Sequence, residues 1–167
     1  RVPTSALIEA DHVQVLMVAE ALDVAVLVPV GTLRRAHHMN VLITGCSRGI
    51  GLEFVRTGMR RQWRIFACCR HPGQAARLTD IAKLAGGSVS LHVVDMTEPA
   101  TIQALAYELR NEPIDLLINN AGIYGSAAHR FGNVDVASWQ QTLLVNSIAP
   151  LKLVEALIDN LRRAPAA

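Results

Sequence analysis

From residue 39 onward, short apolar runs alternate with longer segments whose apolar residues recur every three or four positions. The runs predict buried strands, and the longer segments predict helices with one apolar face. The predicted strands are residues 40–44, 64–69, 88–94 and 114–119. The predicted helices are residues 49–62, 74–85, 98–110 and 135–163. Because strands and helices that alternate in this way indicate βαβ units, we predict an α/β fold with a doubly wound parallel sheet.

Residues that start, stop or bend helices fit these boundaries. The glycines at 86–87 end the second helix, and Thr97 can cap the third, with Pro99 tolerated in its first turn. Asp135 can cap the last helix, and Pro150 predicts a kink inside it.

The composition narrows the class of protein. Hydrophobic residues make up 51% and charged residues 18%, which excludes a disordered chain. Only 4% of residues are aromatic, so the core is aliphatic, as in a buried parallel sheet. A net charge of +2 does not give the strongly basic surface that a nucleic-acid partner requires. No run reaches the roughly 20 uncharged apolar residues of a membrane span, so neither nucleic acid nor membrane is an expected partner.

Three cysteines, Cys46, Cys68 and Cys69, form no Cys-x-x-Cys motif, and adjacent cysteines rarely bridge each other. We predict buried thiols in strands and a reducing, cytoplasmic location. The alternative is a zinc site with His71, but the spacing and number of ligands are poor, and we predict no metal.

A glycine-rich segment, residues 44–51, lies between the first predicted strand and the first predicted helix. Gly45 permits a tight turn, Gly49 lets the backbone approach a pyrophosphate, and Gly51 lets the helix pack against the sheet. The helix N-terminus offers free N–H groups to phosphates. The alternative is that these glycines serve only as a turn.

Four features occur in register along the chain. They are Thr44-Gly-x-x-x-Gly-x-Gly51, Asp95 after the third strand, Asn-Asn-Ala-Gly at 119–122 after the fourth, and Asn146 in the last helix. Their order and spacing resemble the short-chain dehydrogenase/reductase family. The segments around residues 43–46, 69–70 and 119–123 resemble in particular the carbonyl reductases grouped with sniffer and C-factor. The resemblance implies a dinucleotide-binding Rossmann-type domain over residues 39–167, truncated after about four strands.

The resemblance also implies roles for single residues. Ser47 and Arg48 would contact the cofactor phosphates, and Asp95 would accept a hydrogen bond from the adenine amino group beside Met96. Asn119 would tie the fourth strand to its neighbour through backbone groups, a structural role. The predicted cofactor-binding residues are Gly45, Ser47, Arg48, Gly49, Ile50, Gly51, Arg70, Asp95, Met96, Asn119, Ala121 and Gly122. The alternatives are a cap or turn role for Asp95 and plain turn chemistry at Asn119.

The end of the second strand, residues 68–72, carries no carboxylate to accept the ribose hydroxyls of NAD. Arg48 and Arg70 could both face the 2′-phosphate of NADP, because the planar guanidinium fork suits phosphate. The sequence therefore predicts NADP(H) over NAD(H). The alternative is that both arginines are solvated surface residues.

In the family, catalysis uses a Ser and a Tyr-x-x-x-Lys pair that follow the matched part. Neither Tyr107 nor Tyr124 has a lysine four residues later, and the chain ends at Ala167. Of the family's catalytic residues only Asn146, which supports the proton relay, is matched; the alternative for Asn146 is a polar residue that bends the helix. We therefore expect a fragment of an oxidoreductase that carries hydride between nicotinamide and a small carbonyl or alcohol, inactive alone. A non-catalytic nucleotide-binding module and an inert remnant remain as alternatives.

Residues 1–38 depart from the family pattern. We predict an amphipathic helix over residues 6–28, ended by Pro29. This extension is either an over-long start or fusion scar before Met39, or a true helix that covers the sheet or binds a partner. The fourth strand is expected at an open sheet edge, and the resemblance implies a homo-oligomer for the full-length form.

Overall fold

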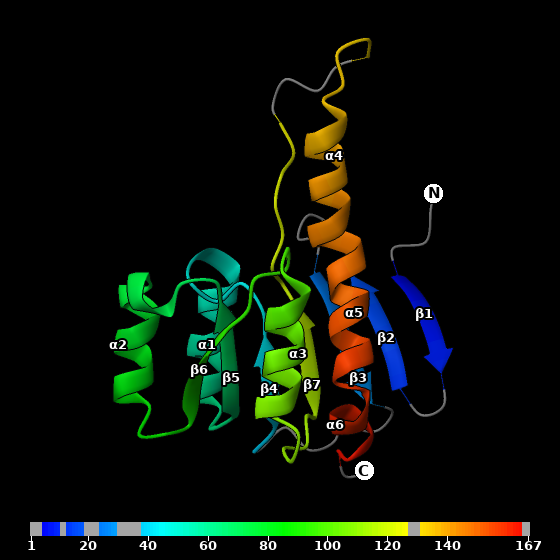
Figure 1. Ribbon diagram of the computed structural model, residues 1–167. Helices are drawn as coiled ribbons and strands as arrows, with labels where there is room; N and C mark the ends of the chain where they lie inside the picture. Colours follow the sequence, from blue (N-terminus) through cyan, green and yellow to red (C-terminus); the bar gives the residue numbers. More distant parts are fainter. Residues whose placement is uncertain (1–4, 11–12, 19–23, 30–37, 127–130, 165–167) are drawn as a thin grey trace.

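The computed structural model describes residues 5–10, 13–18, 24–29, 38–126 and 131–164. Their strands form one seven-stranded sheet in the order β1-β2-β3-β7-β4-β5-β6 (Figure 1). Helices cover both faces of its parallel half, which confirms the predicted doubly wound α/β fold.

Four parallel strands make up that half of the sheet. They are β4 (Asn40–Ile43), β5 (Arg64–Cys69), β6 (Val89–Val93) and β7 (Leu116–Asn119). Asn40 pairs with Arg64 of β5, while Val41 pairs with Leu116 of β7, so β4 lies between β5 and β7. Each predicted strand is present, and β5 has the predicted boundaries.

Alternate residues of these strands face opposite cores, as the pleat requires. On one face, Ile43 packs with residues of α1 (Gly49–Arg60) and α2 (Ala76–Leu84). On the other face, Leu42 packs with residues of α3 (Pro99–Glu108), α5 (Ala149–Ala156) and α6 (Ile158–Arg162). Both cores are dominated by aliphatic side chains, as the composition predicts.

The helix predicted over residues 6–28 is wrong. The described part of this region forms three antiparallel strands, β1 (Ser5–Ala10), β2 (Val13–Val18) and β3 (Val24–Pro29). Valine occupies alternate positions in β3 and recurs in β2, and this β-branched residue favours strands over helices.

The prediction of an open sheet edge at β7 is also wrong, because one of these three strands covers that edge. Strand β3 pairs antiparallel with β7, placing Ala25 opposite Asn119, Val26 opposite Ile118 and Leu27 opposite Leu117. Backbone N–H and C=O groups on an unpaired strand lack partners, and β3 provides them.

The last predicted helix is divided into several segments. Asp135 caps α4 (Val136–Leu143) by accepting a hydrogen bond from the Ser138 backbone nitrogen at 3.2 Å, as predicted. The π-helical segment η3 (Leu144–Ile148) follows and leads into α5, where Pro150 lies in the first turn. Proline has no N–H to donate to the preceding turn, and next to Pro150 the helix departs from α-helical geometry as a π turn.

Two other local predictions have different outcomes. Gly86 and Gly87 follow α2 with φ of 56° and 91°, which confirms the glycine stop. Thr97 does not cap α3, because the helix begins at Pro99 and its N-cap position, Glu98, makes no side-chain cap bond. The short 3₁₀ turn η2 (Pro72–Gln74) joins β5 to α2.

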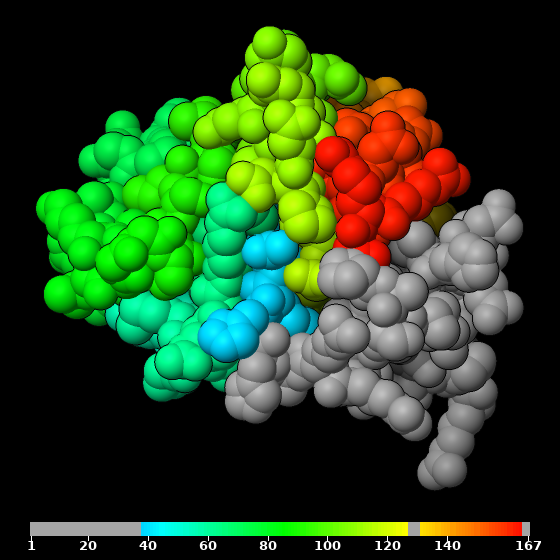
Figure 2. All heavy atoms as spheres, turned by 90° about the horizontal axis from the view of Figure 1, so that it is seen from below, coloured from blue at the N-terminus to red at the C-terminus, as the bar shows by residue number. Residues whose placement is uncertain are grey.

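Figure 2 shows the end of the molecule at which the parallel strands begin, where the start of β4, the segment before β7 and α6 meet. There the buried Asn160 amide donates to the carbonyl oxygens of Leu109 at 2.6 Å and Glu112 at 2.8 Å. The backbone carbonyl oxygen of Asn160 accepts from the Ile114 nitrogen at 3.0 Å. Asn160 therefore holds α6, the end of α3 and the start of β7 together.

Candidate functional site

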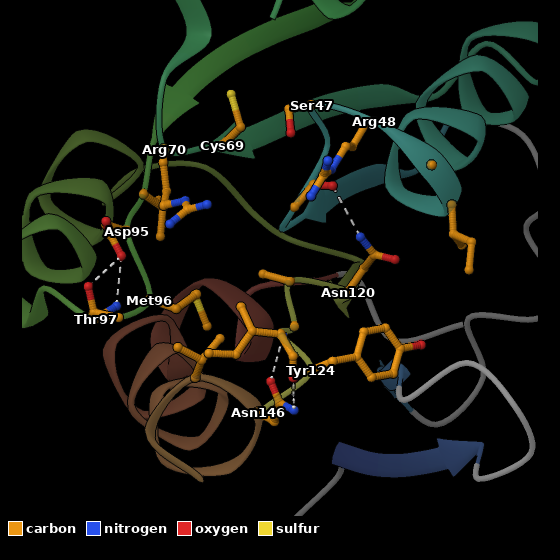
Figure 3. A pocket seen from close by; sticks show the side chains of 18 of the residues that line it. Ser47, Arg48, Cys69, Arg70, Asp95, Met96, Thr97, Asn120, Tyr124 and Asn146 are labelled. Atoms are coloured by element: carbon orange, nitrogen blue, oxygen red, sulfur yellow. Dashed lines mark hydrogen bonds between the residues drawn. The ribbon is translucent and has the colours of Figure 1, made fainter. Parts of the chain in front are cut away.

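A cavity of about 380 Å³ lies at the carboxyl ends of the parallel strands, where loops following β4, β5, β6 and β7 converge (Figure 3). Ligands bind outside the carboxyl ends of the strands in open α/β sheets, and this cavity occupies that position. Its lining residues are Gly45, Ser47, Arg48, Gly49, Ile50, Cys69, Arg70, Val94, Asp95, Met96, Thr97, Asn120, Ala121, Gly122, Ile123, Tyr124, Gln141, Val145 and Asn146.

The glycine-rich loop has the close approaches that its sequence predicts. Gly45 has φ of 71°, and a Cβ there would lie 2.9 Å from the Cα of Ala121. A Cβ on Gly51 would collide with the carbonyl oxygen of Gly45. Any larger residue at either position would push the loop away from α1 or from the segment after β7.

Hydrogen bonds fix this loop to the segment that follows β7. The hydroxyl of Thr44 accepts from the backbone nitrogens of Asn120 and Ala121, each at 3.0 Å. The Asn120 amide donates to the carbonyl oxygens of Thr44 at 2.9 Å and Gly45 at 3.3 Å. The floor of the cavity is therefore held in shape by the protein alone.

The amino end of α1 opens into the cavity. Its N-cap residue, Arg48, makes no side-chain cap bond, and the first turn contains no acidic residue. Ser47, Arg48 and Gly49 are exposed on the same loop. Uncapped N–H groups at a helix N-terminus, with an arginine beside them, suit an anion such as a phosphate.

Asp95 follows β6 and lies on the cavity wall with Arg70, which follows β5 (Figure 3). Partial burial alone would raise the pKa of Asp95. Hydrogen bonds from Thr97 and the nearby charges of Arg70 and His71 outweigh burial and hold that pKa below its ordinary value. The carboxylate is therefore ionised at neutral pH and accepts hydrogen bonds only.

Asn146 lies in the π-helical segment and reaches the segment after β7. Its side-chain oxygen accepts from the Ile123 nitrogen, and its side-chain nitrogen donates to the Ile123 oxygen, both at 2.9 Å. This pair of bonds joins η3 to the cavity wall. In the described structure the Asn146 amide thus holds the backbone of Ile123 in place. Its part in a proton relay stays a prediction.

The structure brings most of the predicted site residues together around the cavity, and only Gly51 and Asn119 lie outside its lining. Gly51 acts by packing under the loop. Asn119 is buried, and its amide nitrogen and oxygen have no hydrogen-bond partner among the residues that the structure describes. Sequence reasoning missed the wall residues Thr97 and Gln141, which lie outside the recognised motifs. It also missed the hydrogen bonds of the Asn120 amide, because a motif names the residue and not its partner.

The thiols of Cys46, Cys68 and Cys69 are free and buried, as predicted, although Cys46 lies in a loop and not in a strand. Burial raises the pKa of each thiol. Within the described residues, no three His, Cys, Asp or Glu side chains come together as metal ligands. No helix in that part of the chain is long and apolar enough to cross a membrane.

The model of the short chain dehydrogenase family matches residues 39–167. The chain belongs to this family. The predicted resemblance is thereby confirmed.

Relatives and solved structures of short chain dehydrogenases match the same part of the chain. A carbonyl reductase from Pseudomonas aeruginosa PAO1, solved in complex with NADP, is 33% identical with a TM-score of 0.67, over 73% of this chain and 56% of that chain. A ketoacyl reductase of Nostoc sp. is 30% identical over 123 residues, covering 72% of this chain and 42% of the relative. A rhamnolipids biosynthesis 3-oxoacyl-[acyl-carrier-protein] reductase of P. aeruginosa is 29% identical over 128 residues, covering 75% and 49%. The chain thus spans about half the length of these relatives or less.

Proposed function

We propose that this chain binds NADP(H) in the cavity and forms the cofactor-binding part of a reductase of small carbonyl compounds. The observation that carries the proposal is the uncapped N-terminus of α1, which opens beside Arg48 into a cavity also lined by Arg70 and Asp95. NADP(H), when bound, supplies the hydride. The protein supplies N–H groups and guanidinium groups for the phosphates and a carboxylate for the base.

The preference for NADP(H) over NAD(H) rests on the residues at the end of β5. Cys69 and Arg70 lie where a carboxylate would accept the ribose hydroxyls of NAD, and both line the cavity. Arg70 and Arg48 provide positive charge for a 2′-phosphate. The P. aeruginosa carbonyl reductase, which resembles this chain, was solved with NADP.

Titration of the 167-residue chain with NADPH and NADH, followed by calorimetry, tests this proposal. We expect NADPH to bind at least tenfold more tightly, and Arg70→Ala to remove most of the difference, because a guanidinium–phosphate contact contributes about 1.5–3 kcal/mol. Leu84→Ala, at an exposed position on α2 away from the cavity, is the control. Equal affinity for the two cofactors would exclude the preference.

Binding without turnover is the expected behaviour of this chain on its own. No Tyr in the 167 residues is followed by Lys four positions later, and the Asn146 amide is engaged with Ile123. An assay of NADPH oxidation with small aldehydes and ketones tests this point. Turnover by the chain alone would overturn it, whereas binding without turnover would also suit a non-catalytic nucleotide-binding module.

Self-association and a cytoplasmic location complete the proposal. Helices α4 and α5 carry exposed apolar residues, among them Val136, Leu143 and Leu151, which suit a second copy of the protein. Leu151→Glu should reduce the mass measured by light scattering, and an unchanged mass would exclude this face.

The free buried thiols suit a reducing compartment.

A further inference from the structure

The side chain of Asp95 is held by one neighbour. Its Oδ1 atom accepts from the backbone nitrogen of Thr97 at 2.9 Å and from the Thr97 hydroxyl at 2.7 Å (Figure 3). Both residues line the cavity. Two donors on one oxygen fix the rotation of the carboxylate and occupy that oxygen.

The backbone of Asp95 is held by a second threonine. The hydroxyl of Thr101, on α3, accepts from the Asp95 nitrogen at 3.0 Å. That hydroxyl also lies 3.0 Å from the Asp95 carbonyl oxygen and 2.8 Å from that of Glu98, and it donates to one of them. The position of Asp95 is therefore set by α3, and its rotation by Thr97.

One acceptor atom is left over. Among the described residues, no donor forms a hydrogen bond with the Oδ2 atom of Asp95. An ionised carboxylate oxygen can accept an N–H group but repels a carbonyl oxygen. The amino group on carbon 6 of adenine is such a donor, whereas hypoxanthine carries an oxygen at that position.

We propose that Thr97 is a positioning residue that selects the base of the dinucleotide: by occupying Oδ1 of Asp95 it leaves Oδ2 to accept the amino group of adenine. This inference rests on the proposed binding of NADP(H). It goes further, because it assigns base selection to a residue that no sequence motif of the site includes.

Calorimetric titration with NADPH and with its hypoxanthine analogue tests the inference. The wild-type chain should bind NADPH about tenfold or more tightly than the analogue, since a hydrogen bond to a charged acceptor is lost. Thr97→Val should reduce this ratio to a few-fold, mainly by weakening NADPH binding, and Thr97→Ser should restore it. Thr79→Val, which removes a hydroxyl bonded to the Pro72 oxygen at 3.2 Å outside the cavity, should leave the ratio unchanged.

The possible failures differ from one another. If the wild-type chain binds neither ligand, the proposed function fails and the inference fails with it. If it binds both ligands equally, or if Thr97→Val weakens both by the same factor, cofactor binding stands and base selection by Thr97 is overturned. A melting temperature measured for each variant identifies any loss caused by unfolding, and Thr97→Ser then decides the outcome.

Discussion

Thr44 and Asn120 hold each other in both directions: the Thr44 hydroxyl accepts from the Asn120 backbone nitrogen at 3.0 Å, and the Asn120 amide donates to the Thr44 carbonyl oxygen at 2.9 Å. They lie 76 positions apart in the sequence, at the ends of the neighbouring strands β4 and β7. This pair joins the glycine-rich loop to the opposite wall of the cavity before any ligand arrives.

Thr44→Val should therefore destabilise the fold and weaken the cofactor site. It leaves the N–H group of Ala121 without its acceptor, while that of Asn120 keeps only the Ile118 oxygen at 3.1 Å, at a cost of about 1–3 kcal/mol in the free energy of unfolding. Thr44→Ser keeps the hydroxyl and should lie close to wild type. Urea denaturation of both variants measures the difference. Wild-type stability in Thr44→Val, with a loss in Thr44→Ser, would show that the methyl group, not the hydroxyl, matters.

Gly51→Ala should disrupt the glycine-rich loop because the added Cβ meets the Gly45 carbonyl oxygen, a backbone atom that cannot rotate away. Overpacking of this kind costs about 1–3 kcal/mol, and the displaced loop should also bind NADPH less well. Gly73→Ala is the matched control, since a Cβ there meets nothing within 4 Å. Thermal melts and NADPH titrations of the two variants check this, and indistinguishable results would contradict the assigned packing role.

The parallel half of the fold could be predicted from the sequence because its signals are local. The apolar run of β5 and the glycine pair after α2 each mark a boundary within a few residues. The motif positions also converge as predicted, since the carboxyl ends of parallel strands meet at one edge of the sheet.

The rest of the fold depends on contacts that no local pattern encodes. The apolar residues in the region of β1, β2 and β3 are compatible with one face of a helix, although the valines of β2 and β3 favour strands. The pairing of β3 with the edge of β7 adds a contact that no local pattern shows. Thr97 looks like a helix cap in sequence, yet Asp95 two residues earlier takes its hydroxyl. The local pattern correctly indicates that the Thr97 side chain makes a hydrogen bond, but it predicts a bond to the start of α3 and not to Asp95.

Asn160 illustrates the same limit and gives a third prediction. In sequence it is a polar residue near the end of a helix, but its buried amide donates to the carbonyl oxygens of Leu109 and Glu112. Asn160→Ala leaves the Glu112 carbonyl oxygen without its donor, whereas the Leu109 carbonyl oxygen keeps the Glu112 backbone nitrogen at 2.8 Å. The free energy of unfolding should fall by about 1–3 kcal/mol. Asn111→Ala, at an exposed position in the turn after α3, should change it little. Similar values for the two variants would refute the bracing role.

Removal of residues 1–38 should expose the edge of β7, because β3 is paired with it in the intact chain. An unpaired edge strand recruits other chains, so we expect the shortened protein to aggregate and its β7 amides to exchange hydrogen faster. Removal of residues 1–10 alone takes away β1 and leaves β3 in place, and should have a smaller effect. Light scattering and hydrogen exchange measure both. Unchanged solubility and thermal stability after the longer deletion would exclude a covering role for β3.

Arg64 and Glu112 should give a pH-dependent contribution to stability. The two side chains form a paired contact, with nitrogen–oxygen distances of 2.5 Å and 2.8 Å, that joins the start of β5 to the turn after α3. Hydrogen bonds from Arg64 hold the pKa of Glu112 below its ordinary value, against a smaller opposing effect of burial. A lowered pKa means that folding favours the ionised carboxylate. The contribution is therefore complete above the ordinary glutamate pKa and is lost as the pH falls through the lowered one.

Arg64→Met should accordingly lower the free energy of unfolding by about 0.3–1 kcal/mol at neutral pH, the range of partly exposed ion pairs. The difference from wild type should shrink as the pH falls below the ordinary glutamate range, and Glu112→Gln should behave in the same way. Urea denaturation across a pH series measures this. The Arg64 guanidinium also lies 5.0 Å from the centre of the Phe66 ring, and that contact does not titrate. A difference that stays constant with pH would therefore assign the stabilisation to the ring contact and not to the ion pair.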